Sequence, residues 1–226
     1  MSEHVVVQMP EGEPGQLFLL FHGVGSTPES LVPVGERLAE EFPSAAVISV
    51  RGPDASDMGS GYQWFSVAGV TEESRAGRIA ATLPRFVETV RRVQAATGAS
   101  AAQTALLGFS QGAIMALAAT QLPGDVLAGR VISLAGRFAG LPAVAPAETT
   151  LHLIHGRRDP VIAHEHSVAA AERLIELGGD VTADVIAGLG HSVDQEVVDL
   201  LVHRLKTHVP KRVWEQAMAA AAGPAS

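Results

Sequence analysis

Short apolar runs, bounded by Gly, Pro and polar clusters, alternate along the chain with longer segments of helical period. The runs are rich in Leu and β-branched residues and show no polar alternation, which is typical of strands covered on both faces. Seven strands are expected, near residues 4–8, 17–21, 46–50, 104–109, 130–135, 151–155 and 182–187. This order predicts an α/β fold with a mostly parallel sheet of about seven strands and helices on both faces.

The clearest helix signal runs from Glu72 to Thr97, where apolar residues recur at steps of three and four. Gly98 is suited to end this helix, because glycine adopts the left-handed conformation without steric cost. A second helix is predicted to open at Thr27-Pro28, an N-cap followed by an N1 proline. A third is predicted to open at Ser192, since Gln195 follows at the spacing of a capping box.

The length and composition predict one folded domain. The chain has 226 residues, of which 47 % are hydrophobic and 18 % charged, so it can bury a sizeable core. The sequence has no large insertion that could form a cap domain. Residues 1–226 are therefore expected to form a single domain with a helical tail at 210–226. The apolar runs, such as 17–21, are far too short to span a membrane.

The charge balance and the residue types exclude several classes of partner and cofactor. The chain carries 16 Lys and Arg against 24 Asp and Glu, a net charge of −8, which disfavours nucleic acid and anionic lipid surfaces. It has no cysteine, which excludes disulfides, thiolate nucleophiles and cysteine-bound zinc. His164 and His166 lack an evident third ligand, so we expect no metal and no cofactor. Residues 1–8 show no secretory signal, and a cytoplasmic location is expected.

The strongest chemical signal is the pentapeptide Gly108-Phe109-Ser110-Gln111-Gly112, which matches G-x-S-x-G. A predicted strand precedes it, and a helix rich in small residues follows it over 112–121. In such a strand-turn-helix the glycines relieve crowding around a serine whose hydroxyl projects alone. This pattern predicts a nucleophile at Ser110. An ordinary serine in a Gly-rich turn is the alternative.

A serine nucleophile needs an imidazole base, which in turn needs a carboxylate, and in this fold they follow the serine in the order acid, then histidine. Asp159 follows the strand at 151–155, at the carboxyl edge where ligands bind in open α/β sheets. His191 follows the last strand at the same edge and is the predicted base. The other aspartates between Ser110 and the end of the last strand precede a strand or lie within one; they are Asp125, Asp180 and Asp184.

Negative charge that develops on the substrate carbonyl requires an oxyanion hole made of N–H groups. One N–H is expected from Gln111, the residue after the nucleophile, and the other from Val24 in the loop that follows the strand at 17–21. His22 precedes Val24 in this Gly-rich loop, and we interpret it as shaping the loop. His152 and His155 are interpreted as packing or hydrogen-bonding residues.

These residues resemble the small α/β-hydrolases of the phospholipase/carboxylesterase family, which includes bacterial carboxylesterases and acyl-protein thioesterases. The resemblance spans nearly the whole chain and is carried by four segments in order: Phe21-His22-Gly23-Val24-Gly25, residues 108–113, residues 155–161 and Gly190-His191. It implies a cofactor-free serine hydrolase with Ser110, Asp159 and His191 as its triad and the Val24 and Gln111 N–H groups as its oxyanion hole.

The resemblance also implies that Trp64 and Phe65 lie in an aromatic loop lining the acyl pocket. In the thioesterase members an acid commonly follows this pair, whereas here Ser66 follows, which favours a bacterial esterase over a protein depalmitoylase. The alternative is that the two aromatics anchor the loop to the core.

The predicted function is hydrolysis of carboxylic esters or thioesters of short to medium acyl chains, through an acyl-enzyme on Ser110. The alternatives are an acyl-protein thioesterase or lysophospholipase-like activity and a non-catalytic binding protein with a hydrolase fold. The expected partner is a small-molecule ester or thioester, without membrane insertion. The chain is expected to be a monomer or homodimer, and the tail segment 209–218 is expected to pack on its own body.

Overall fold

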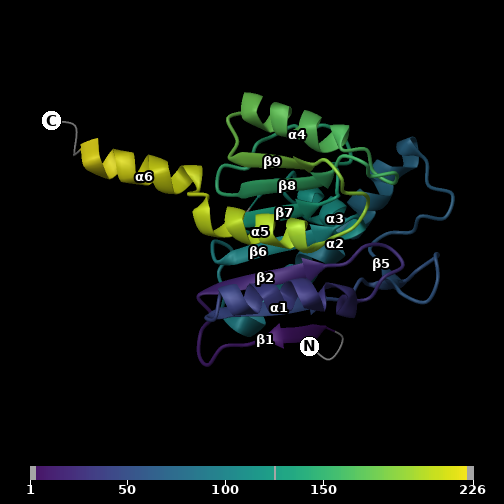
Figure 1. The fold of residues 1–226 in the computed structure, drawn as a ribbon, viewed down its shortest axis with the longest axis horizontal. Coiled ribbons are helices and arrows are strands. Elements are labelled where there is room, and N and C mark those ends of the chain that lie inside the picture. The colour runs from purple at the N-terminus through teal and green to yellow at the C-terminus, as the bar shows by residue number, and fades with distance from the viewer. Residues whose placement is uncertain (1–3, 125, 223–226) are drawn as a thin grey trace.

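The computed structural model describes residues 4–124 and 126–222. They form a small two-stranded sheet of Asp54–Ala55 (β4) and Tyr62–Gln63 (β5), and a seven-stranded sheet with helices on both faces (Figure 1). The strands lie in the order β1-β3-β2-β6-β7-β8-β9, with β1 antiparallel to β3 and all other pairs parallel. Their bounds are Val5–Gln8 (β1), Gln16–Phe21 (β2), Ala45–Val50 (β3), Thr104–Phe109 (β6), Arg130–Leu134 (β7), Thr150–Gly156 (β8) and Val181–Ile186 (β9). The predicted strands and the mostly parallel α/β sheet are confirmed.

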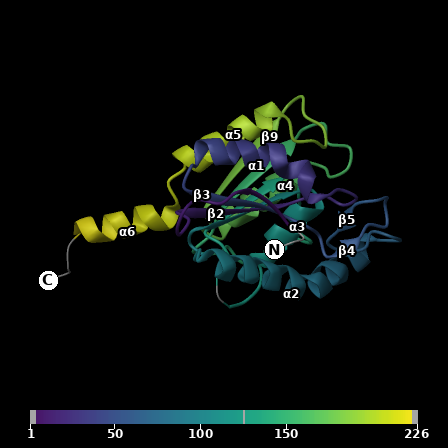
Figure 2. The same cartoon turned by 90° about the horizontal axis from the view of Figure 1, so that it is seen from below.

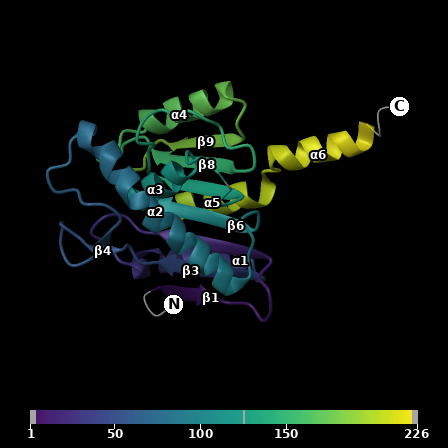
Figure 3. The same cartoon turned by 180° about the vertical axis from the view of Figure 1, so that it is seen from behind.

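Helices cover both faces of the sheet (Figures 2 and 3). One face carries α1 (Val32–Glu41) and α5 (Gln195–Thr207), and the other carries α2 (Glu72–Thr97), α3 (Gln111–Ala119) and α4 (Glu165–Glu176). Strand β2 shows why its run is continuously apolar: Leu17, Leu19 and Phe21 pack on the α2 side, while Phe18 and Leu20 pack on the α1 side. Since successive side chains point to opposite faces, a strand buried on both sides has no polar position.

The helix α2 has the predicted bounds, with Gly98 in the left-handed conformation at φ 74°. A helix opens at Thr27-Pro28 as predicted, with Thr27 in the N-cap position, but Pro28–Leu31 form a 3-10 helix. The predicted cap is wrong, because the Thr27 side chain makes no capping hydrogen bond. An α-helix begun at Pro28 would need an N–H from Pro33, which proline lacks. The α-helix α1 therefore starts only at Val32.

The start predicted for α5 is also wrong. The N-cap is Asp194, whose side chain accepts the N–H of Val197 at 3.1 Å, and the helix begins at Gln195. A carboxylate satisfies a free N–H at a helix N-terminus and also opposes the positive end of the helix dipole. Asp194 therefore takes the capping role predicted for Ser192.

The expected helical tail forms α6 (Lys211–Ala222), but it does not pack on the body as predicted. It projects from the sheet edge at which the parallel strands begin (Figures 1 and 3), and Trp214 is 58 % exposed. Its contacts with the body lie at its root, where the Lys211 Nζ donates to the Gly178 carbonyl at 2.8 Å. Residues 223–226 of the predicted tail lie outside the described residues. Within the described part of the chain, no helix is long and apolar enough to cross a bilayer.

Candidate active site

Ser110 occupies a strained turn between β6 and α3. Its φ of 53° and ψ of −115° place a non-glycine residue in a sparsely populated backbone region. A Cβ atom at Gly108 would lie 2.3 Å from the Ala113 nitrogen, and one at Gly112 would lie 2.1 Å from the Phe21 oxygen. Only glycine fits at these two positions. The G-x-S-x-G pattern is thus explained by contacts on both sides of the serine.

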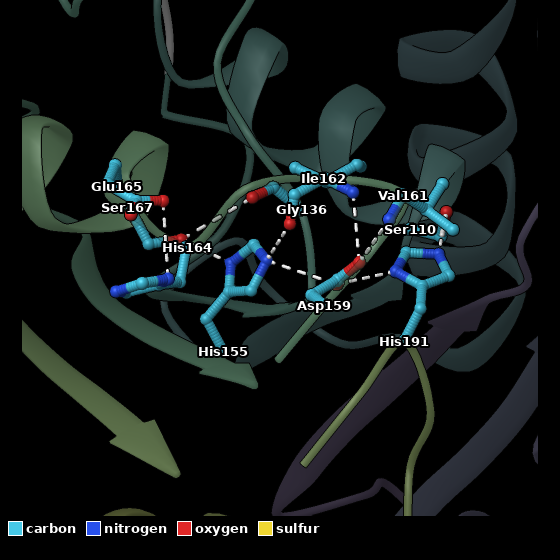
Figure 4. Close-up of polar contacts among 10 residues, drawn as sticks. All are labelled: Ser110, Gly136, His155, Asp159, Val161, Ile162, His164, Glu165, Ser167 and His191. Atoms are coloured by element: carbon cyan, nitrogen blue, oxygen red, sulfur yellow. Dashed lines mark hydrogen bonds and ion pairs between the residues drawn. The ribbon is translucent and has the colours of Figure 1, made fainter. Parts of the chain in front are cut away.

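His191 reaches Ser110 from the loop after β9. Its Nε2 atom lies 2.9 Å from the Ser110 Oγ atom (Figure 4). The ring of Phe109 lies against the imidazole, with 5.0 Å between ring centroids. The neighbour of the serine therefore helps to hold the histidine, a role that sequence analysis did not assign to Phe109.

Asp159 holds the other side of the His191 ring, with its Oδ2 atom 2.6 Å from Nδ1 (Figure 4). Its Oδ1 atom accepts the N–H groups of Val161 and Ile162 at 2.8 and 2.9 Å. Burial raises the pKa of Asp159, but these hydrogen bonds outweigh it, so the pKa lies below its usual value. An ionised carboxylate only accepts, so Nδ1 carries the proton and Nε2 is free to accept from Ser110.

The loop after β2 passes directly beside the serine. A Cβ atom at Gly23 would lie 3.3 Å from the Ser110 Cβ atom, so only a small residue lets this loop approach without displacing its neighbours. Val24 follows Gly23 in the loop. Gln111 provides the first N–H of α3, where N–H groups lack partners within the helix and the dipole is positive. The loop and the helix start predicted to supply the oxyanion hole thus both adjoin Ser110.

His22 fixes the shape of this loop, as predicted. Its Nδ1 atom lies 2.7 Å from the Gly23 oxygen, and its Nε2 atom accepts the N–H of Gly52 at 2.9 Å. The ring is fully buried, and burial lowers its pKa. A neutral ring that donates through Nδ1 and accepts through Nε2 satisfies both contacts.

The Gln111 side chain ties the aromatic loop to the turn that carries Ser110, a contact that sequence analysis did not predict. Its Oε1 atom accepts the N–H of Trp64 at 2.8 Å, and its Nε2 atom donates to the carbonyl of Phe65 at 2.7 Å. The Trp64 indole donates to the His22 carbonyl at 2.9 Å and is 1 % exposed. Trp64 and Phe65 therefore anchor this loop to the core, and their contribution to an acyl pocket stays a prediction.

A strained serine between a parallel strand and a helix, joined to an imidazole and a carboxylate at the same sheet edge, defines an α/β-hydrolase. Comparison with known proteins agrees, since the model of the phospholipase/carboxylesterase family matches residues 2–209. The chain belongs to this family. That membership confirms the resemblance seen in the sequence and the prediction of an esterase.

Individual relatives point the same way. Esterase YpfH of Escherichia coli (strain K12) is 48 % identical over 217 residues, covering 96 % of this chain and 93 % of that protein. Acyl-protein thioesterase 1 of Neurospora crassa is 26 % identical, covering 85 % and 86 %. Among solved structures, esterase PE8 aligns with a TM-score of 0.77 at 28 % identity, covering 87 % of this chain and 94 % of that one. A carboxylesterase from Mesorhizobium loti shares the fold, with a TM-score of 0.73 at 21 % identity, covering 87 % and 91 %.

Proposed function

We propose that the protein hydrolyses carboxylic esters through an acyl-enzyme on Ser110, with His191 as general base and Asp159 as the residue that orients it. The observation that carries this proposal is the continuous chain of contacts from Ser110 Oγ to His191 Nε2 at 2.9 Å and from His191 Nδ1 to Asp159 Oδ2 at 2.6 Å. Both distances are within hydrogen-bond reach without movement of the protein.

In the first half of the reaction, His191 Nε2 takes the Ser110 proton as Oγ attacks the ester carbonyl carbon. The imidazolium that forms is stabilised by Asp159, and it returns the proton to the departing alcohol when the ester C–O bond breaks. In the second half, water gives its proton to the same Nε2 atom and attacks the acyl-enzyme. When the bond between the acyl carbon and Oγ breaks, His191 returns the proton to Oγ, which releases the carboxylic acid and restores the Ser110 hydroxyl.

The negative charge on the carbonyl oxygen is proposed to be held by the N–H groups of Gln111 and Val24. The Gln111 N–H stands at the positive end of α3, which favours an anion there. Among the described residues, the Val24 N–H has no hydrogen-bond partner, so it is available to a substrate oxygen. The hydrogen bonds of His22 hold this loop in place and so keep the Val24 N–H beside Ser110.

Short to medium acyl chains are the proposed substrates, with Trp64 and Phe65 bordering the acyl group. A thioester is the second candidate, because the curated relatives include acyl-protein thioesterase 1 of Neurospora crassa. The leaving thiol would replace the alcohol, and the same residues would act.

The test is a chain-length series of p-nitrophenyl esters alongside a long-chain acyl thioester, assayed with the wild type, Ser110→Ala and His191→Ala. We expect activity to peak at short to medium chains and the serine variant to lose about 10⁶-fold in turnover. A tenth or more of the wild-type activity in Ser110→Ala would contradict the acyl-enzyme. A preference for the long-chain thioester would favour the second candidate, and no activity on any ester would favour a binding protein.

A further inference from the structure

A second imidazole contacts the carboxylate of the proposed triad. Figure 4 shows Asp159 between the rings of His191 and His155. The Nε2 atom of His155 lies 3.2 Å from Asp159 Oδ2 and 2.8 Å from the carbonyl oxygen of Ile162. The His155 and Asp159 side chains are both fully buried. Asp159 is therefore held from two sides, although only one of them faces Ser110.

The contacts of His155 define its protonation. Both partners of Nε2 only accept hydrogen bonds, so Nε2 carries a proton. The Nδ1 atom lies 2.7 Å from the Ser167 Oγ atom. That hydroxyl has one proton and is 3.4 Å from its other acceptor, the Gly136 carbonyl, so the proton goes to Nδ1. Ser167 thus selects the tautomer in which His155 donates towards Asp159.

The His155 ring is neutral. Burial lowers its pKa, and the hydrogen bond to the Ile162 carbonyl and the Asp159 carboxylate only partly oppose that effect. The titratable groups that face it are Asp159 and His191. A neutral donor holds the carboxylate without cancelling its charge, so the full charge of Asp159 is left to stabilise His191 when that ring becomes an imidazolium.

Ile162 connects the ring and the carboxylate a second time. Its N–H donates to Asp159 Oδ1 at 2.9 Å, and its carbonyl accepts from His155. Movement of the His155 ring would therefore shift both carboxylate oxygens, Oδ2 directly and Oδ1 through the backbone of Ile162. The turn that carries Asp159 has its geometry fixed by a side chain from β8.

We propose that His155, locked by Ser167, is a positioning residue that holds the Asp159 carboxylate in the orientation His191 requires. The inference rests on the proposed function, since it assigns His155 a role only if Asp159 and His191 act as stated. His155 does not touch the reacting atoms. Its loss should therefore lower kcat and leave KM nearly unchanged.

The experiment compares His155→Leu, His155→Gln and Ser167→Ala with His152→Leu. His152 is a matched control, because it is an equally buried histidine on the same strand and is bonded to Thr182 instead of the site. Each purified protein is checked by circular dichroism and assayed on the preferred p-nitrophenyl ester, with Ser110→Ala and His191→Ala in parallel. Proton NMR follows the signal of the His191 Nδ1 proton in the hydrogen bond to Asp159. This signal is assigned by its disappearance in Asp159→Asn.

We expect His155→Leu to lower kcat by about 10- to 100-fold, the scale of a misplaced catalytic group, and to shift the NMR signal. The glutamine amide keeps a donor near the position of Nε2 and should restore most of the rate. His152→Leu should keep both rate and signal. A folded His155→Leu with the kcat of His152→Leu would overturn the proposal, as would a wild-type kcat in Ser167→Ala if His155→Leu does not fold. Activity retained in Ser110→Ala or His191→Ala would instead contradict the proposed function.

Discussion

The backbone of Gly112 lies so close to Phe21 that a Cβ atom at position 112 would be 2.1 Å from the Phe21 carbonyl oxygen. Phe21 ends β2 and Gly112 lies in the first turn of α3, so this approach sets the spacing between the Ser110 turn and the loop that carries Val24. The second glycine of the motif therefore positions two parts of the site at once.

Gly112→Ala should destabilise the protein by about 3 kcal/mol or more, because the clash is with backbone that cannot rotate away. The matched control is Gly77→Ala on α2, where nothing lies within 4 Å of the added atom; it should stabilise by about 0.5–1 kcal/mol. Urea unfolding of both variants measures these changes. Equal stability of Gly112→Ala and the wild type would show that the spacing is not fixed by this contact.

Gln111→Leu should distinguish the role of the Gln111 side chain from the role of its backbone N–H. The variant leaves the buried N–H of Trp64 and the carbonyl of Phe65 without their hydrogen-bond partner. The free energy of unfolding should fall by about 1–3 kcal/mol for each group. Gln121→Leu is the control, since Gln121 bonds to the surface segment at Val144 and should change stability by about 0.5 kcal/mol or less. Thermal unfolding compares the two.

The same variant also tests the loop. Loss of the two side-chain hydrogen bonds should loosen the aromatic loop, whereas the backbone N–H at position 111 is retained. KM should therefore rise more than kcat falls. A large loss of kcat with unchanged KM would argue that the side chain, and not only the N–H, acts in the reaction.

The buried His152 should make the protein less stable in acid. Burial, Arg130 and His208 lower the pKa of His152 to about 3, below its unfolded value of 6.5. Between these two pH values the unfolded chain binds a proton that the folded chain does not, so the free energy of unfolding falls as pH falls through that window. His152→Gln should reduce the slope by up to one proton, measured by urea unfolding from pH 7 to pH 4. Identical slopes in the two proteins would contradict a neutral buried ring.

Local signals made much of the fold predictable. The periodicity of α2 and its glycine stop gave its bounds, and the continuous apolar runs gave the strands. The edge of the sheet at which each residue must emerge selected Asp159 and His191 among the candidates that follow Ser110, since parallel strands end together.

Features set by distant contacts were not predictable. Trp64 is as compatible with a pocket as with the core until the positions of Gln111 and His22 are known. The start of α5 depended on whether Ser192 or Asp194 could reach the free N–H groups of the helix. Asp194 reaches them. The direction of α6 has no signature in its own sequence, because an amphipathic pattern states which face is apolar and not what covers it.

The most direct test of the central claim is covalent labelling by an activated p-nitrophenyl phosphonate, located by peptide mass spectrometry and timed by p-nitrophenol release. The account predicts one adduct per chain, on Ser110, and a labelling rate that falls by several orders of magnitude in His191→Ala, because only a serine paired with its base is a strong nucleophile. An adduct on another residue, or a labelling rate that His191→Ala leaves unchanged, would contradict it.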